Sequence, residues 1–130
     1  DALILISRYP WLGVGFAGTP DIDTYLGVSS VYLLIAEEMG VIGLTAFLSV
    51  LITFLGRFLR TFRLSSRDWE LDPLLMGMCL SVCGAMVAGL VDHYLFNLDF
   101  PHASALLWLM LGLGTVSIEL IREKHEQVEF

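Results

Sequence analysis

The chain has 130 residues, of which 56% are hydrophobic and 16% charged, and its formal net charge is −7. Soluble domains are usually about 45–50% apolar, so this composition favours a protein built for a lipid bilayer. The negative charge argues against a nucleic acid partner, because phosphate binding requires a basic surface. The sequence begins at Asp1 and carries no signal-peptide pattern, and we expect it to be the C-terminal part of a longer protein.

Residues 1–28 do not have the pattern of a membrane span. Pro10 and the closely spaced glycines after it break regular structure, and Arg8 is a charge within the segment. We predict a short helix or interfacial segment up to about Arg8, followed by an ordered loop outside the membrane. Aromatic rings such as Trp11 suit the headgroup level.

The first membrane span is predicted over residues 30–56. Glu37 and Glu38 come immediately before a run, residues 39–56, that has no charge. As a helix at 1.5 Å per residue this run is about 27 Å long, close to the roughly 30 Å of a bilayer's hydrocarbon core. The two carboxylates are therefore expected to mark the edge of the membrane.

Two more spans are predicted over residues 73–91 and 103–121, with Pro73 as the first residue of its helix. Basic residues gather after the first span and after the third, and such excess marks cytoplasmic flanks. These cations are Arg57, Arg60, Arg63, Arg67, Arg122 and Lys124. We therefore expect residues 57–72 and the C-terminus to be cytoplasmic, and residues 1–28 and 92–102 to be outside.

The predicted fold is an all-α integral membrane protein with three transmembrane helices and an extracytoplasmic loop segment before them. We predict a single membrane domain over residues 1–130, in which residues 1–28 are the loop segment and residues 29–130 a three-span helical bundle. The third span is expected to end in a solvated helical tail. Residues from other helices of the same longer protein are expected to pack against this bundle.

Small residues lie where helices can approach one another closely. Gly40 and Gly43 sit just inside the first span, where bare backbone permits close packing or a bend. Ser81, Ala85 and Gly89 repeat every four residues along one face of the second span, which favours helix packing over a ligand groove. The two cysteines of that span are expected to pack as small hydrophobes rather than to bind metal.

The outer loop between the second and third spans carries Asp92, His93, Asp99 and His102. Carboxylates and imidazoles this close can act as acid and base or bind a divalent cation, and they can also serve only as polar caps between spans. Their spacing fits no metal motif. Asp92 and His93 are the better candidates for catalysis because they end the second span.

Two segments carry a resemblance to a known family. YPWLGVGFAG, residues 9–18, is similar to a P-x-x-G-V-G-F-G segment, and SSVYLLIAEEMGVIGLTAFL, residues 29–48, looks like an H-N-x-Y-L-x-x-x-x-E-x-G-x-x-G stretch. In these segments the chain resembles the C-terminal part of the O-antigen ligase and O-antigen polymerase-like family of bacterial membrane proteins. The later sequence ALLWLMLGLG fits the family's return helix loosely.

The resemblance implies a multi-pass glycosyltransferase of the bacterial inner membrane that takes part in cell-surface polysaccharide assembly. Its donor would be a glycan on undecaprenyl pyrophosphate, its acceptor a lipid-core sugar or another glycan, and its surroundings membrane lipid; no metal or other cofactor is implied. Such transfer needs a group that positions the acceptor hydroxyl and cations that stabilise the departing pyrophosphate. The family is thought to use a histidine and arginines of an outer loop.

Carried onto this sequence, the resemblance singles out five residues. Arg8 is the candidate contact for pyrophosphate, although an arginine there can also hold the loop to lipid headgroups. The family's histidine falls on Ser29, and a serine cannot act as a base near neutral pH. Tyr32, Glu37 and Glu38 are the candidate substrate-binding residues; the carboxylates can equally bind loop backbone or a helix N-terminus.

The departure at Ser29 leaves three readings within the family: a polymerase-like relative, a different glycan-joining activity, or a relative without activity. The alternative from another class is a non-catalytic multi-pass membrane subunit or a transporter, in which Asp92 and His93 gate a polar path. In the upstream sequence of the longer protein, a transporter is expected to show inverted repeats and broken helices. An enzyme of this family is expected to carry a base and further outer-loop arginines there.

Overall fold

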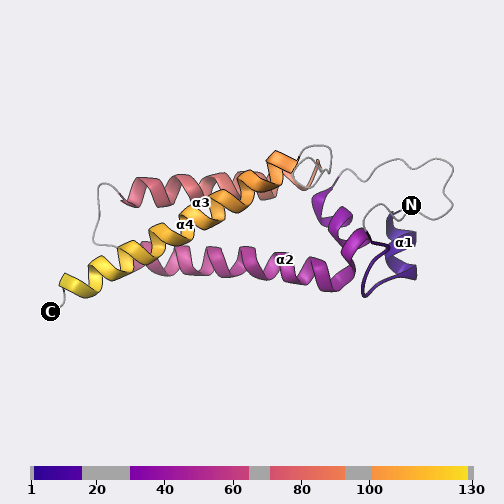
Figure 1. Cartoon of the computed structure of the whole chain (residues 1–130), viewed down its shortest axis with the longest axis horizontal. Coiled ribbons are helices and arrows are strands. Elements are labelled where there is room, and N and C mark those ends of the chain that lie inside the picture. The colour runs from indigo at the N-terminus through magenta and orange to yellow at the C-terminus, as the bar shows by residue number, and fades with distance from the viewer. Residues whose placement is uncertain (1, 16–29, 65–70, 93–100, 129–130) are drawn as a thin grey trace.

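A computed structural model of the chain describes residues 2–15, 30–64, 71–92 and 101–128, and these segments contain four helices and no strand (Figure 1). The helices are α1 (Ala2–Arg8), α2 (Val31–Leu64), α3 (Leu71–Ala88) and α4 (Pro101–Val128). Three of them, α2, α3 and α4, are long and apolar enough to cross a membrane. The predicted all-α class with three membrane-length helices is confirmed, as is a short helix ending at Arg8.

The ends of the long helices differ from the predicted ends of the spans. Helix α2 continues past residue 56 to Leu64, so that the first three arginines of the basic cluster lie on its last turns. Helix α4 likewise runs on past residue 121 to Val128. The helical backbone does not stop where the apolar run stops, because arginine, lysine and glutamate are themselves good helix formers.

Helix α3 begins at Leu71, two residues before the predicted start at Pro73. Asp72 lies in its first turn, where a carboxylate is stabilised by the positive end of the helix dipole. Pro73 is tolerated at the third position because the first amide groups of a helix have no partner within it. The predicted starting residue was wrong. A proline fits the third position of a helix for the same reason that it fits the first.

The three long helices alternate in direction. Helices α2 and α4 run away from the end of the molecule where α1 lies, and α3 returns toward it (Figure 1). Helix α4 packs most extensively on α3 and also contacts α2. An ion pair between Arg57 on α2 and Glu119 on α4 shows that the basic ends of these two helices lie together.

The core of the bundle is a single cluster of apolar side chains from all three long helices. It consists of Leu51, Phe54, Phe58, Leu75, Cys79, Val82, Leu107, Leu111, Ile118 and Ile121. Cys79 is buried within it, Cys83 packs against it, and both thiols are free. The cysteines therefore act as packing residues in this fold.

Close approach between helices depends on glycine at two places. A Cβ added at Gly114 of α4 would lie 2.7 Å from Cε2 of the Phe54 ring, so this core ring packs directly on bare backbone. A Cβ added at Gly89, just after α3, would lie 3.3 Å from the Cβ of Val31 at the start of α2. The predicted close packing is confirmed at Gly89.

Replacing Gly114 by alanine is expected to destabilise the bundle by about 1–3 kcal/mol, because the new methyl group overlaps the Phe54 ring in a packed core. Gly112→Ala is the matched control, since a Cβ at Gly112 meets no atom within 4 Å. The free energy of unfolding of the two variants in detergent, measured by titration with a denaturing detergent, checks this. Equal stability of the two variants would contradict the packing described here.

Candidate functional site

The first membrane-length helix is broken near one end. At Gly40 the backbone of α2 leaves the helical region, with φ 68° and ψ −172°, so α2 consists of a short first part and a long second part. Figure 1 shows the two parts at a steep angle, with α1 beside the break. The sequence predicted close packing or a bend at Gly40 and Gly43, and the structure shows an interruption of the helix at Gly40.

Residues 9–15, which follow α1, fill the break, and we call them the docking segment. The amide of Val14 donates to the carbonyl oxygen of Glu37 at 2.8 Å, and the amide of Gly15 donates to the carbonyl oxygen of Glu38 at 2.9 Å. These two carbonyls belong to the last turn of the first part of α2, where a helix has no amide partner of its own to offer. The docking segment therefore caps the C-terminal end of that part.

The same segment also caps the second part of α2. The amide of Val41 donates to the carbonyl oxygen of Pro10 at 2.8 Å, and the amide of Ile42 donates to that of Trp11 at 3.5 Å. These are the first amides after the break and would otherwise lack acceptors. One short segment thus pairs carbonyls on one side of the break and amides on the other.

Two glycines make this docking possible. Gly13 and Gly40 both have positive φ, 69° and 68°, which side chains on an L-residue disfavour. A Cβ at Gly13 would overlap the backbone of Glu37 and Glu38, and a Cβ at Gly40 would overlap the carbonyl of Trp11. Gly15 also has positive φ, 82°, but a Cβ there meets no atom within 4 Å. Conformation requires glycine at all three positions, and close approach requires it at Gly13 and Gly40.

The two carboxylates before the break lie in different surroundings. Glu37 is 2% exposed and is one of the most completely buried side chains of the chain's described part. Glu38 is half-buried. Glu37 is therefore enclosed by protein at the break, whereas Glu38 retains access to solvent or to a bound molecule. Sequence reasoning did not distinguish the two.

The start of α2 is fixed to the end of α3. The amide of Val31 donates to the carbonyl oxygen of Gly89 at 2.8 Å, and the Ser30 hydroxyl donates to the same oxygen at 3.2 Å. The Tyr32 hydroxyl donates to the carbonyl oxygen of Met86 at 2.8 Å. Ser30, Val31 and Tyr32, at the start of α2, thus donate to two carbonyls at the end of α3.

These contacts complete the hydrogen bonding at the end of α3. Its last four carbonyls have no partner in a regular helix. Three of them accept from amides of the turn that follows. The carbonyl of Ala85 accepts from the amide of Gly89, that of Val87 from Leu90, and that of Ala88 from both Val91 and Asp92. With Tyr32 on Met86, every one of the four is paired, as an apolar environment requires.

The structure gathers several of the predicted site residues at this end of the bundle. Tyr32, Glu37 and Glu38 all lie on the first part of α2, between the docking segment and the end of α3. Arg8 is the last residue of α1, directly before the docking segment, and its side chain is exposed. Asp92 has an exposed side chain just after α3. Helix α4 also begins at this end (Figure 1).

Three predicted residues of the outer loops, Ser29, His93 and Asp99, lie outside the described residues. His102 is the second residue of α4 and is exposed. Among the residues that the structure describes, no three histidine, cysteine, aspartate or glutamate side chains are grouped so as to hold a metal ion. The described polar groups of this end are carboxylates, hydroxyls, one guanidinium and the imidazole of His102, which can bind hydroxyl and phosphate groups through hydrogen bonds.

Sequence reasoning missed the docking of residues 9–15 and a charged cluster at the other end of the bundle. There Arg57 pairs with Glu119, and the guanidinium of Arg122 lies 3.5 Å from the same carboxylate. Glu119 falls inside the predicted third span, where a lone carboxylate is costly without a cation. A carboxylate within an apolar run was the sequence signal for this cluster, and the glycines at positions 13, 15 and 40 were the signal for the docking.

Comparison of the chain with protein-family models, with curated proteins and with solved structures finds no match. What this end of the bundle can bind therefore follows from its own residues and geometry.

Gly13→Ala is expected to displace the docking segment, whereas Gly15→Ala is not. Both substitutions carry the cost of positive φ, about 1–2 kcal/mol, but only the methyl group at Gly13 overlaps the backbone of α2. Hydrogen exchange at the amides of Val14 and Val41, followed by mass spectrometry, measures the docking. Faster exchange in Gly13→Ala alone is the expected result, and equal exchange in the two variants would refute the close approach.

Tyr32→Phe is expected to lower the free energy of unfolding by about 1–3 kcal/mol, because the carbonyl of Met86 loses its donor within an apolar bundle. Tyr9→Phe is the control, since the Tyr9 ring is 50% exposed and its substitution leaves the helix contacts intact. Both variants are compared by denaturing-detergent titration. A loss of stability in Tyr9→Phe equal to that in Tyr32→Phe would contradict this role for the hydroxyl.

Proposed function

We propose that the chain belongs to a multi-pass glycan-joining enzyme that resembles the O-antigen ligase and polymerase-like family. In this proposal the enzyme transfers or polymerises undecaprenyl-pyrophosphate-linked glycan on the outer face of the bacterial inner membrane, and it thereby takes part in cell-surface polysaccharide assembly. The observation that carries the proposal is the docking of residues 9–15 into the break of α2, because these are the two places in which the resemblance lies.

The resemblance and the geometry meet at the same glycines. Gly13 and Gly15 belong to the family-like P-x-x-G-V-G pattern, and Gly40 belongs to the family-like E-x-G pattern. Among the described residues, these three are the glycines with positive φ. A chance match to the pattern is not expected to coincide with these three positions. A family whose outer loop docks on a broken helix would require glycine at them. This agreement supports the family assignment.

The proposed orientation follows from the distribution of the cations. Arg57, Arg60 and Arg63 on α2 and Arg122 and Lys124 on α4 lie toward one end of the bundle, and Arg8 lies beside the break at the other. An excess of lysine and arginine is typical of cytoplasmic flanks. We therefore place the basic end in the cytoplasm and the break, α1 and the docking segment at the outer face, where the family's glycans are joined.

The residues of the outer end suit distinct roles in glycosyl transfer. Arg8 is exposed, and its planar guanidinium fits phosphate oxygens. Glu38 is half-buried beside the break and can accept a hydrogen bond from a sugar hydroxyl, while buried Glu37 holds the local structure. Because Ser29 replaces the histidine of the family pattern, the base comes from another group, for which Asp92 and His93 are the candidates within this chain.

The broken helix is also the feature that a transporter would share. In transporters of that kind the ends of half-helices are left open to bind ions and substrates. Here Glu37, Glu38, Val41 and Ile42 at the break already bond to the backbone of the docking segment. The backbone groups at the break therefore hold the docking segment, which favours the enzyme over the transporter. A non-catalytic membrane subunit is the remaining alternative.

The test is glycan transfer by the full-length protein, reconstituted in vesicles with undecaprenyl-pyrophosphate-linked glycan and a series of acceptors, with products separated on a gel. Longer or transferred products are expected. Arg8→Ala is expected to lower their rate about tenfold or more, the effect of one charge-assisted contact to phosphate. Arg63→Ala, which removes an exposed arginine from the opposite end of the bundle, is the matched control and should leave the rate unchanged.

Two results would count against the proposal. Absence of product with every acceptor, in vesicles that contain the folded protein, would favour a non-catalytic subunit. Equal losses in Arg8→Ala and Arg63→Ala would show that positive charge in general, and not a contact at the outer end, supports the reaction. The fold of each variant is checked by hydrogen exchange at the amides of the docking segment.

A further inference from the structure

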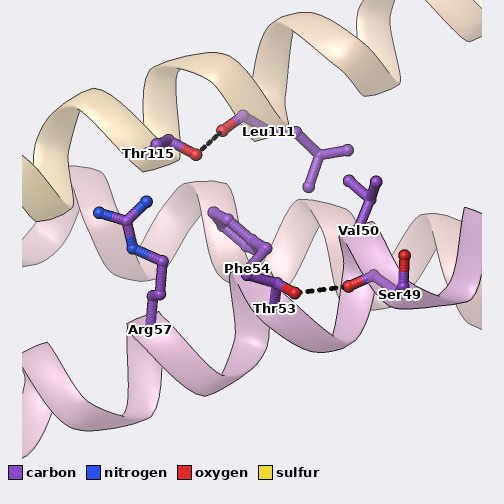
Figure 2. A pocket seen from close by; sticks show the side chains of 7 residues that line it. All are labelled: Ser49, Val50, Thr53, Phe54, Arg57, Leu111 and Thr115. Carbon is purple, nitrogen blue, oxygen red and sulfur yellow. Dashed lines mark hydrogen bonds between the residues drawn. The ribbon is translucent and has the colours of Figure 1, made fainter. Parts of the chain in front are cut away.

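The side of the bundle between α2 and α4 is hollowed by an open groove of about 260 Å³. Figure 2 shows its two walls, which come from the middle of α2 and from the facing part of α4. It is lined by Ser49, Val50, Thr53, Phe54, Arg57, Leu111 and Thr115. The groove thus runs along the long second part of α2 and ends at Arg57, away from the break at Gly40.

The walls of the groove are apolar despite their three hydroxyl groups. Each hydroxyl donates to a carbonyl of its own helix: Ser49 to Ala46, Thr53 to Ser49 and Thr115 to Leu111, all at 2.7 Å. Their hydrogens are therefore used within the helices, as the dashed lines of Figure 2 show for two of them. The side chains of Val50, Phe54 and Leu111 supply the rest of the surface, which suits a hydrocarbon chain.

One end of the groove is strongly cationic. The Arg57 guanidinium pairs with Glu119, and Arg122 lies 3.5 Å from the same carboxylate. The side chains of these three residues are 37%, 45% and 51% exposed, so the cluster is accessible from outside the bundle. Arg57 uses one nitrogen for Glu119, and a guanidinium carries five donors, which leaves it able to bind a further anion.

The periodicity of the helices adds Arg60 to this mouth as a third cation. Arg60 follows Thr53 by seven residues and Arg122 follows Thr115 by seven, so each lies on the same side of its helix as a residue that lines the groove. Glu123 comes one residue after Arg122 and projects about 100° further round the helix. The mouth therefore holds three cations, Arg57, Arg60 and Arg122, and two carboxylates: Glu119 and, seven residues after it on the same side of α4, Glu126. Its net charge is positive.

We propose that this groove binds an anionic phospholipid, with one acyl chain between α2 and α4 and the phosphate group held by Arg60, Arg122 and the free nitrogens of Arg57. An apolar slot in a membrane-length helix pair that ends in net positive charge is complementary to such a lipid. Cations near a membrane surface attract anionic lipid with about 1 kcal/mol each. The lipid would join the basic ends of α2 and α4, which the structure otherwise links through Glu119.

Charge also decides between the lipid and other occupants. A second copy of this chain in the same membrane would bring its own arginines to the same depth, where like charges repel. A zwitterionic lipid would gain less from the three arginines because its own cation offsets its phosphate. The cationic mouth of the groove lies toward the opposite end of α2 from the docking segment, so this binding site is independent of the proposed glycan transfer.

Native mass spectrometry of the full-length protein, released from vesicles of phosphatidylglycerol and phosphatidylcholine in equal amounts, tests the proposal. The wild type is expected to retain phosphatidylglycerol in preference to phosphatidylcholine. Arg60→Gln is expected to lower this retention about fivefold, the effect of one cation near the surface. Arg63→Gln, at another exposed arginine on a different side of α2, is the matched control and should retain the lipid as the wild type does.

A second pair of variants tests the groove itself. Thr53→Phe fills the slot and is expected to abolish preferential retention, whereas Ile52→Phe, at a side chain 68% exposed outside the groove, is expected to leave it unchanged. The proposal is overturned if both lipids are retained alike, if Arg60→Gln and Arg63→Gln fall equally, or if Thr53→Phe has no effect. It is also overturned if inorganic phosphate displaces the lipid. A measured mass that contains two copies of the chain in the wild type, but one copy in Thr53→Phe, would overturn it as well.

Discussion

The fold of this protein depends on one constraint: backbone amides and carbonyls in an apolar environment must find partners. A helix interrupted at Gly40 leaves such groups on both sides of the interruption, and each unpaired group costs several kcal/mol in hydrocarbon. Residues 9–15 supply acceptors for Val41 and Ile42 and donors for two carbonyls before the break. The break and the docking segment therefore stabilise each other.

This mutual dependence explains the arrangement of the bundle at the end where α1 lies. Helix α1 lies beside α2 because the segment that follows α1 is held in the break (Figure 1). The start of α2 is held separately by the end of α3, through Val31 and Tyr32. The short first part of α2, which carries Glu37 and Glu38, is thus fixed at both ends. A carboxylate at such a position is held in place without needing a rigid loop around it.

The opposite end is organised by side-chain charge instead of backbone pairing. Arg57 and Glu119 join α2 to α4, and Arg122 adds a second cation to the same carboxylate. The pair is partly exposed, so its contribution to stability is modest compared with that of the apolar core. Its placement matters more for what the end can bind, because an apolar groove opens directly beside it (Figure 2). The two ends of one bundle thus offer different chemistry.

The sequence by itself determined the all-α class and the three helices of membrane length, because long uncharged apolar runs are local patterns that need no partner. It also identified the glycines and carboxylates near Gly40 as a distinctive stretch. Only the tertiary structure decided that Gly13 meets Gly40's helix, that Glu37 is buried while Glu38 is not, and that Glu119 pairs with Arg57. Each of these depends on which segments come together across the chain, and residue spacing within one segment does not contain that information.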